Sequence, residues 1–129
     1  MIVDTSAVVA ILRAEPNSAA LEHALAQVGG HLMSAATRVE LSLVLAATHT
    51  EQEVDEVLVG WGVSVVPFTA EQAKVAAEGH RVFGKGNHPA KLNLGDTYSY
   101  ALARATGQPL LCTGNDFALT DLALALPEP

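Results

Sequence analysis

Residues 1–9 read MIVDTSAVV, and this opening decides how the rest of the chain is interpreted. Ile2 and Val3 are β-branched, which predicts a short buried strand at the very start of the chain. Asp4 follows at the end of that strand. An aspartate in this position either caps a helix that starts at Thr5, or takes part in chemistry at the end of the strand. Whether other acidic residues join Asp4 decides between the two.

Length and composition favour one soluble folded unit. A chain of 129 residues, half of them hydrophobic, is expected to form a single domain over residues 1–129. The single cysteine, Cys112, cannot form an internal disulfide, which suggests a reducing compartment and an inert thiol in the core. No apolar run approaches the ~20 residues that cross a bilayer, and no basic leader precedes residues 7–12. We therefore expect a cytoplasmic protein that does not enter a membrane.

Helical and strand-like segments alternate along the chain. Helical i, i+3, i+4, i+7 spacing of apolar residues appears three times. The stripes are Leu21, Ala24, Leu25 and Val28; Val54, Val57, Leu58 and Trp61; and Tyr98, Ala101, Leu102 and Ala105. Short apolar runs suited to buried strands lie at 31–33, 63–66, 110–112 and 122–126. This alternation predicts an α/β fold with a parallel sheet covered by helices on both faces.

Glu40 is the most informative acidic residue after Asp4. In a helix through TRVELSLVLAA, its neighbours at i+3 and i+4 are Leu43 and Val44, so Glu40 falls on an apolar face. A lone buried carboxylate is costly unless it is paired or binds a metal. A salt bridge with Arg38, or a position near solvent, would explain Glu40 without any function.

Asp96 and Asp116 can each be explained locally, yet together they indicate a site. Asp96 precedes the helix TYSYALARA and suits an N-cap, while Asp116 lies in the turn TGNDF after a strand. However, Asp4 and Asp116 both follow strands, and the carboxyl ends of parallel strands line the ligand crevice of an open sheet. Four converging carboxylates would repel one another without cations, and oxygen ligands of this kind select Mg²⁺ or Mn²⁺. The five histidines show no close ligand spacing, which argues against zinc.

The motifs MIVDTSA, ATRVE, GKGNHPAKLNLGDTYSYALA and PLLCTGNDFALTDL resemble the PIN-domain ribonuclease toxins of type II toxin–antitoxin systems, the VapC group. The resemblance runs essentially from end to end. It implies a PIN-like three-layer α/β/α sandwich around a short parallel central sheet. It also implies a Mg²⁺- or Mn²⁺-dependent endoribonuclease that is restrained by an antitoxin and forms a homodimer.

The resemblance assigns roles to individual residues. The acidic quartet that is expected to bind metal and carry catalysis is Asp4, Glu40, Asp96 and Asp116. Ser6 and Thr113 match hydroxyls that line the site, and Asn115 could share or take the role of Asp116. Position 97 is Thr, where many relatives carry Cys.

RNA contacts and competing functions complete the expectations. The formal charge is −7, but residues 74–104 contain five of the seven basic residues. Within that stretch, Arg81, Lys85 and Lys91 are candidates for phosphate contacts, with exposed solvated charges as the alternative. A non-catalytic PIN-like binding protein stays open, as does a phosphatase that forms an aspartyl-phosphate. The phosphatase is disfavoured because Ser6 occupies the position of its usual second aspartate.

Overall fold

The computed structural model describes residues 1–27 and 29–126 and contains a four-stranded parallel sheet. The strands are β1 (Ile2–Val3), β2 (His31–Ser34), β3 (Val63–Val66) and β4 (Leu110–Leu111). Their order in the sheet is β3-β2-β1-β4, so β1 lies between β2 and β4. The register pairs Ile2 with both Leu32 and Leu110. The four expected strands before residue 120 are therefore confirmed.

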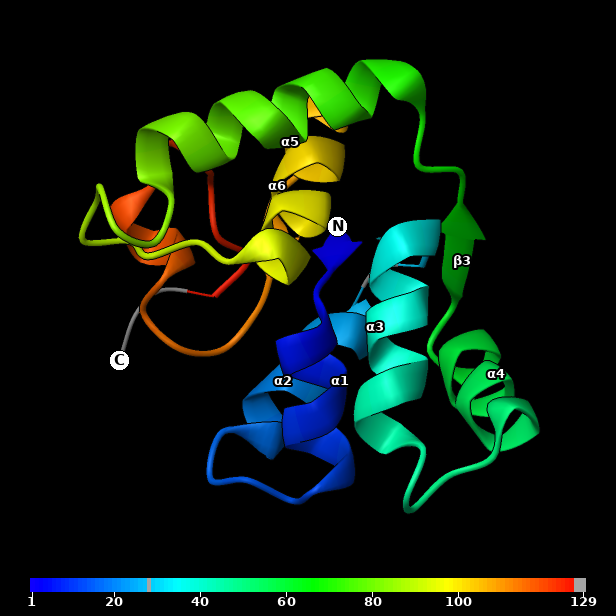
Figure 1. Cartoon of the computed structure of the whole chain (residues 1–129). Helices are drawn as coiled ribbons and strands as arrows, with labels where there is room; N and C mark the ends of the chain where they lie inside the picture. The colour runs from blue at the N-terminus through cyan, green and yellow to red at the C-terminus, as the bar shows by residue number, and fades with distance from the viewer. Residues whose placement is uncertain (28, 127–129) are drawn as a thin grey trace.

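Helices connect the strands and cover the sheet (Figure 1). They are α1 (Thr5–Leu12), α2 (Ser18–Gln27), α3 (Ala35–Leu45), α4 (Glu51–Gly60), α5 (Ala70–Phe83) and α6 (Leu94–Thr106), followed by the 3₁₀ turn η1 (Phe117–Leu119). The expected helical stripes fall in α2, α4 and α6, except that Trp61 caps α4 and Val28 lies outside the described residues. Among the described residues, none of these helices has the length and apolar character needed to cross a membrane.

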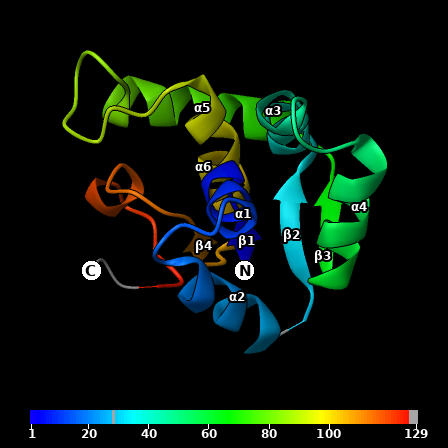
Figure 2. The same ribbon diagram turned by 90° about the horizontal axis from the view of Figure 1, so that it is seen from below.

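The two faces of the sheet pack against different helices. Side chains alternate along a strand. Accordingly Val3 and Leu111 belong to a core shared with α1 to α4, whereas Ile2 and Leu110 join a second core with α6. Figure 2 shows α2 on one side of the strands and α5 with α6 on the other. The protein is therefore a three-layer α/β/α sandwich, as the resemblance implied, and helices cover both faces of the parallel sheet, as the alternation of segments predicted.

The expected fifth strand at 122–126 is wrong. This segment makes only an isolated parallel bridge, from Leu124 to Leu110 of β4. Two backbone hydrogen bonds hold it there: Leu110 N donates to the Ala123 carbonyl, and Ala125 N donates to the Leu110 carbonyl. Because β4 itself is only two residues long, it offers little edge for a neighbour to pair with.

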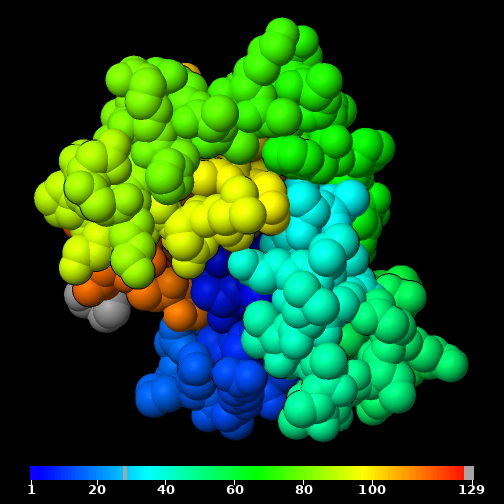
Figure 3. Space-filling view, viewed as in Figure 1, coloured from blue at the N-terminus to red at the C-terminus, as the bar shows by residue number. Residues whose placement is uncertain are grey.

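The carboxyl ends of β1, β2 and β4 point toward one region of the molecule. Asp4 follows β1 directly, and its backbone N–H donates to the carbonyl of Leu111 at the end of β4 (3.0 Å). In the space-filling view, the dark blue start of the chain is visible between the yellow beginning of α6, the cyan α3 and an orange segment (Figure 3). The candidate site lies in this hollow.

Candidate functional site

Asp4 is buried, with 3% of its surface exposed, and it both caps α1 and belongs to the site. One carboxylate oxygen, Oδ2, accepts hydrogen bonds from the backbone N–H of Ser6 (3.0 Å) and from its hydroxyl (2.7 Å). The other, Oδ1, accepts from the hydroxyl of Ser99 on α6 (2.6 Å). Hydrogen bonds of this kind fix the orientation of a carboxylate. The capping role and the site role are therefore compatible.

Glu40 reaches the same region from α3. Its Oε1 accepts a hydrogen bond from the hydroxyl of Thr5 (2.6 Å), the first residue of α1. Its carboxylate also lies against the backbone of Gly95 on α6. A Cβ added to Gly95 would stand 2.6 Å from Cδ of Glu40 and would overlap its Oε2. The absence of a side chain at position 95 therefore allows this carboxylate to lie beside Asp96.

Arg38 does not pair with Glu40. Its guanidinium binds Glu51 (2.7 Å) and Asp55 (3.0 Å) on α4 and contacts the Ser42 hydroxyl. The salt-bridge explanation of Glu40 is therefore wrong.

The helix face that Glu40 shares is not core, contrary to the expectation. Leu43 is 74% exposed, Val44 is also exposed, and Glu40 itself is half-buried. Buried contacts of α3 come instead from Thr37, Leu41 and Leu45. Apolar spacing alone cannot distinguish a core-facing stripe from an apolar surface.

Asp96 lies in the first turn of α6, which begins at Leu94 and not at Thr97, where an Asp96 cap would have started it. Asn93 is the N-cap, and its Oδ1 accepts from the N–H of Asp96 (3.0 Å), while Oδ2 of Asp96 accepts from the N–H of Asn93 (3.0 Å). This reciprocal arrangement is a capping box. The pKa of Asp96 is raised to about 6. Burial is the main cause, and the charges of Asp4, Asp116 and Glu40 raise it further, whereas the hydrogen bond from the Asn93 N–H lowers it.

Asp116 lies after β4, and its charge acts on the other groups of the site. Asp116 is exposed at the start of η1 and makes no side-chain capping bond. The charge of Asp116 contributes to the raised pKa of Asp96. It also contributes to the raised pKa of Cys112, which is about 12, mainly because of burial and then because of the charges of Asp4, Asp96 and Asp116. Cys112 is thus an inert thiol, as expected. It is half-buried beside the site, rather than a member of the core.

The supporting positions contact the site in different ways. The Ser6 hydroxyl bridges the site, since it donates to Asp4 and accepts from the backbone N–H of Thr113 (3.1 Å). Thr113 therefore contributes its main chain to this contact, where a hydroxyl was expected. Asn115 is exposed and makes no hydrogen bond among the described residues. Thr97 is buried, and its hydroxyl donates to the Leu94 carbonyl (2.6 Å).

Sequence reasoning missed three residues that position the acids: Thr5, Gly95 and Ser99. Ser99 is buried and lies three residues after Asp96 on α6, a spacing that puts both on one face of a helix. This spacing was a usable signal for a hydroxyl beside the acids. The contacts of Thr5 and Gly95 with Glu40 join distant parts of the chain, and no local pattern reveals them.

The candidate RNA-binding cations are exposed. Arg81 forms an ion pair with Glu78 on α5 (2.6 Å), which offsets its charge. Lys85 and Lys91 lie in the irregular segment 84–93 between α5 and α6 and make no ion pair with the residues that the structure describes. The backbone of this segment is held by a bridge between Gly84 and Leu92.

The donor set fits a hard divalent cation. Burial, and after it the charges of Asp4, Asp116 and Glu40, raises the pKa of Asp96, and a bound cation would offset those like charges. Across residues 1–27 and 29–126, however, no group of three or more His, Cys, Asp or Glu side chains has the spacing of a ready metal cage. The carboxylates are therefore neighbours that do not converge on a single point.

Comparisons with known proteins agree with this fold. Residues 1–122 match the family model of the PIN domain. Ribonuclease VapC42 of Mycobacterium tuberculosis (strain ATCC 25618 / H37Rv) is 47% identical over 126 residues, covering 95% of this chain and 96% of the relative.

Two solved structures share the fold at low sequence identity. Mycobacterium tuberculosis VapC20, described as a sarcin-ricin loop cleaving toxin, superimposes with a TM-score of 0.72 at 20% identity and covers 95% of both chains. A toxin–antitoxin complex from Klebsiella pneumoniae gives a TM-score of 0.71 at 18% identity, covering 91% of this chain and 89% of that one.

Proposed function

Since the chain belongs to the PIN-domain family and to its VapC ribonucleases, we propose that it is a Mg²⁺- or Mn²⁺-dependent endoribonuclease and the toxin of a type II toxin–antitoxin pair. In this proposal Asp4, Glu40, Asp96 and Asp116 form the catalytic and metal-binding quartet. The observation that carries it is the position of Asp4, buried at the carboxyl end of β1, with Glu40, Asp96 and Asp116 near enough for the charges of Asp4, Asp116 and Glu40 to add to the burial that raises the pKa of Asp96. Such clustered like charges, at the carboxyl ends of parallel strands, suit a site that binds cations.

The chain's own residues hold three members of the quartet, Asp4, Glu40 and Asp96, in place. Ser6 and Ser99 each donate to one oxygen of Asp4, so its carboxylate is held from α1 and from α6. Thr5 holds Glu40, and the main chain at Asn93 holds Asp96. These contacts set the orientation of the acids before any ligand arrives. Because these acids are already oriented, little free energy is needed to reorganise the site when the reaction begins.

The proposed reaction is hydrolysis of a phosphodiester bond. Water adds to phosphorus, one P–O ester bond breaks, and no protein nucleophile is consumed. When bound, a divalent cation would supply charge stabilisation at the phosphate and lower the pKa of an attacking water. The acids named above would hold it. Because the hydroxyl of Ser6 is already engaged with Asp4 and Thr113, it is not offered as a nucleophile.

Lys85 and Lys91 are proposed to contact phosphates that flank the cleaved bond. Both are exposed and lie on the segment that leads directly into α6 and Asp96. Arg81 is the weaker candidate because Glu78 already binds its guanidinium through two hydrogen bonds.

The proposed partner is a cognate antitoxin. An Arg or Lys side chain inserted among the four acids would replace the charge of a cation and block the site. The reaction is proposed to take place in the cytoplasm, and the expected homodimer stays a prediction.

An RNA cleavage assay tests the proposed function. Purified protein should cut single-stranded RNA with Mn²⁺ or Mg²⁺ and stop when EDTA is added. Asp4→Asn should abolish cleavage. Asp55→Asn is the matched control because it makes the same chemical change at an exposed carboxylate of α4. Cleavage that persists in EDTA, or equal loss in both variants, would contradict the proposal.

A further inference from the structure

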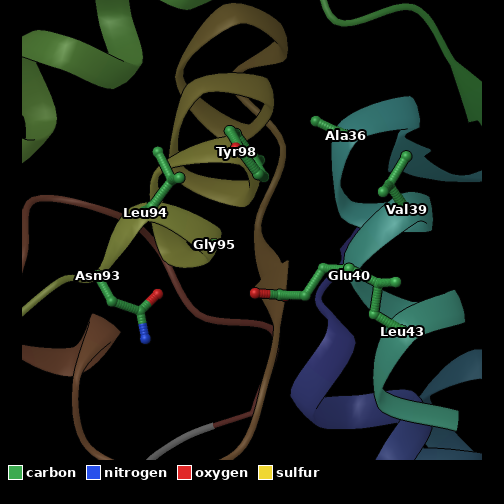
Figure 4. A pocket seen from close by; sticks show the side chains of 8 residues that line it. All are labelled: Ala36, Val39, Glu40, Leu43, Asn93, Leu94, Gly95 and Tyr98. Carbon is green, nitrogen blue, oxygen red and sulfur yellow. The ribbon is translucent and has the colours of Figure 1, made fainter.

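Helix α6 contacts three of the four acids of the proposed site. It carries Asp96 in its first turn, and its Ser99 donates a hydrogen bond to Asp4 (2.6 Å). Figure 4 shows the Glu40 side chain extending from α3 toward Gly95 at the start of the same helix. The positions of these three acids are therefore all referred to α6.

Asp116, the fourth acid, lies on a separate segment between β4 and η1. It is exposed, and its side chain makes no capping bond to η1. On its amino side, the Thr113 N–H donates to the Ser6 hydroxyl (3.1 Å). Between these two points lies Gly114, whose φ of 86° is in the left-handed region that favours glycine. The position of Asp116 therefore depends on how the backbone on its carboxyl side is anchored.

The backbone that follows Asp116 is anchored to α6. Phe117 is 3% exposed and belongs to the second core, which it shares with side chains of α6. Thr120 closes the turn, because its N–H (3.1 Å) and its hydroxyl (2.6 Å) both donate to the Phe117 carbonyl. The carboxylate of Asp121 then accepts a hydrogen bond from the guanidinium of Arg104, in the last turn of α6 (3.0 Å).

Asp121 has a second partner on α6. Burial, and after it a hydrogen bond with Asp121 and the charge of that carboxylate, raises the pKa of Tyr100 to about 12. Tyr100 and Arg104 are four residues apart, so they lie on one face of the helix. Tyr100 also packs against α5, since a Cβ added to Gly79 would stand 2.6 Å from its ring. Asp121 is thus bound to a part of α6 that is itself held by a neighbouring helix.

We propose that Asp121 is a positioning residue: by tying the end of the segment 116–121 to α6, it holds Asp116 within the acidic site. Tyr100 and Arg104 are its partners in this role. The inference rests on the proposed function, because it concerns the fourth member of the proposed quartet. An exposed ion pair contributes little to the stability of a fold. The main effect is therefore expected on metal binding, where loss of a residue that orients a ligand typically costs about 10–100-fold.

The first test measures cleavage of a short oligoribonucleotide as a function of Mn²⁺ concentration. Asp121→Ala should raise the Mn²⁺ concentration that gives half-maximal cleavage by about tenfold. Binding of the same RNA in EDTA should match that of the wild type, because the proposed phosphate contacts are untouched. Arg104→Ala and Tyr100→Phe each remove one partner of Asp121 and should cause smaller shifts in the same direction.

Asp55→Ala is the matched control. Asp55 also pairs with an arginine at 3.0 Å, but it joins α4 to α3 and does not contact the segment 116–121. In an Asp116→Ala background, Asp121→Ala should cause no additional loss of the rise in melting temperature that Mn²⁺ produces. Wild-type Mn²⁺ dependence in Asp121→Ala, an equal shift in Asp55→Ala, or an additive loss in the double variant would overturn the proposal.

Hydrogen exchange separates this inference from the proposed function, because it needs neither metal nor RNA. In the metal-free protein, Asp121→Ala should increase deuterium uptake over residues 113–119 and leave α4 unchanged, whereas Asp55→Ala should leave 113–119 unchanged. Arg104→Ala should repeat the effect, and its exposed position indicates that the fold survives the change. This pattern supports the positioning role even if the wild type cuts no RNA. Unchanged uptake over 113–119 in both Asp121→Ala and Arg104→Ala would contradict it, whatever the cleavage assay shows.

Discussion

Gly95→Ala should inactivate the protein while leaving it folded. The new methyl group would overlap Oε2 of Glu40 and lie 2.6 Å from its Cδ, so the carboxylate must move. Because Glu40 is half-buried and flexible, it can rotate away from α6. Rotation breaks the 2.6 Å hydrogen bond from Thr5 and removes Glu40 from the proposed quartet.

The expected size of the effect on stability is small. Loss of a hydrogen bond to a charged group costs about 1.5–3 kcal/mol. Replacing glycine by alanine within a helix returns up to about 1 kcal/mol. The net change in the free energy of unfolding should therefore be a loss of about 0.5–3 kcal/mol, by the same estimates. The loss of cleavage should be larger, about 10–100-fold, as for changes that misplace a metal-binding group.

Denaturant unfolding and RNA cleavage measured on the same preparations provide the test. Gly60→Ala is the matched control, because nothing lies within 4 Å of a Cβ at that exposed position and its φ requires no glycine. In a Glu40→Ala background, Gly95→Ala should cause no additional loss of cleavage. Wild-type activity in Gly95→Ala, or an equal further loss in the double variant, would refute the reasoning.

Three other changes probe the site and its surroundings. Ser99→Ala removes the buried donor to Asp4 (2.6 Å) and should cost about 1.5–3 kcal/mol in denaturant unfolding, together with much of the cleavage activity; an unchanged unfolding midpoint would argue against that bond. The pKa of Asp96 in the folded protein, about 6, exceeds its ordinary value of 3.8. Protonated Asp96 therefore stabilises the metal-free protein below pH 3.8, and this contribution is lost as the pH rises through 6. Asp96→Asn should abolish that loss in melts between pH 4 and 7, whereas parallel curves for both proteins would contradict the shift. Replacing Lys85 and Lys91 by Ala should lower the salt dependence of RNA binding by about 0.7 per lost phosphate contact without changing affinity for Mn²⁺, and a wild-type slope would place the RNA elsewhere.

The sheet could be predicted from sequence because its strands are short runs of apolar residues separated by amphipathic helices. Ile2, Val63 and Leu110 each belong to such a run, and each lies in an observed strand. The segment 122–126 has the same composition but makes a single bridge, because strand formation also needs an edge long enough to pair with. The edge it would use, β4, is set by the tertiary fold.

The acids of the proposed site could be singled out from the sequence, but their surroundings could not. Asp4 and Asp116 follow strands, which the sequence reveals directly. That Glu40 bonds Thr5 and rests on Gly95 depends on how α3 packs beside α1 and α6, which is a property of the assembled fold. The same packing leaves Leu43 exposed. Its apolar side chain predicted a place in the core, but it lies on the surface.

The central claim is that the acidic quartet binds a divalent cation, and a thermal melt with and without Mn²⁺ tests it most directly. A ligand that binds only the folded state at a hundredfold excess over its Kd stabilises that state by about 2.7 kcal/mol. Wild-type protein and Asp55→Asn should therefore melt at a higher temperature in saturating Mn²⁺ than in EDTA, and Asp4→Asn should not. Equal melting temperatures of the wild type in both conditions, or an equal rise in Asp4→Asn, would contradict the account.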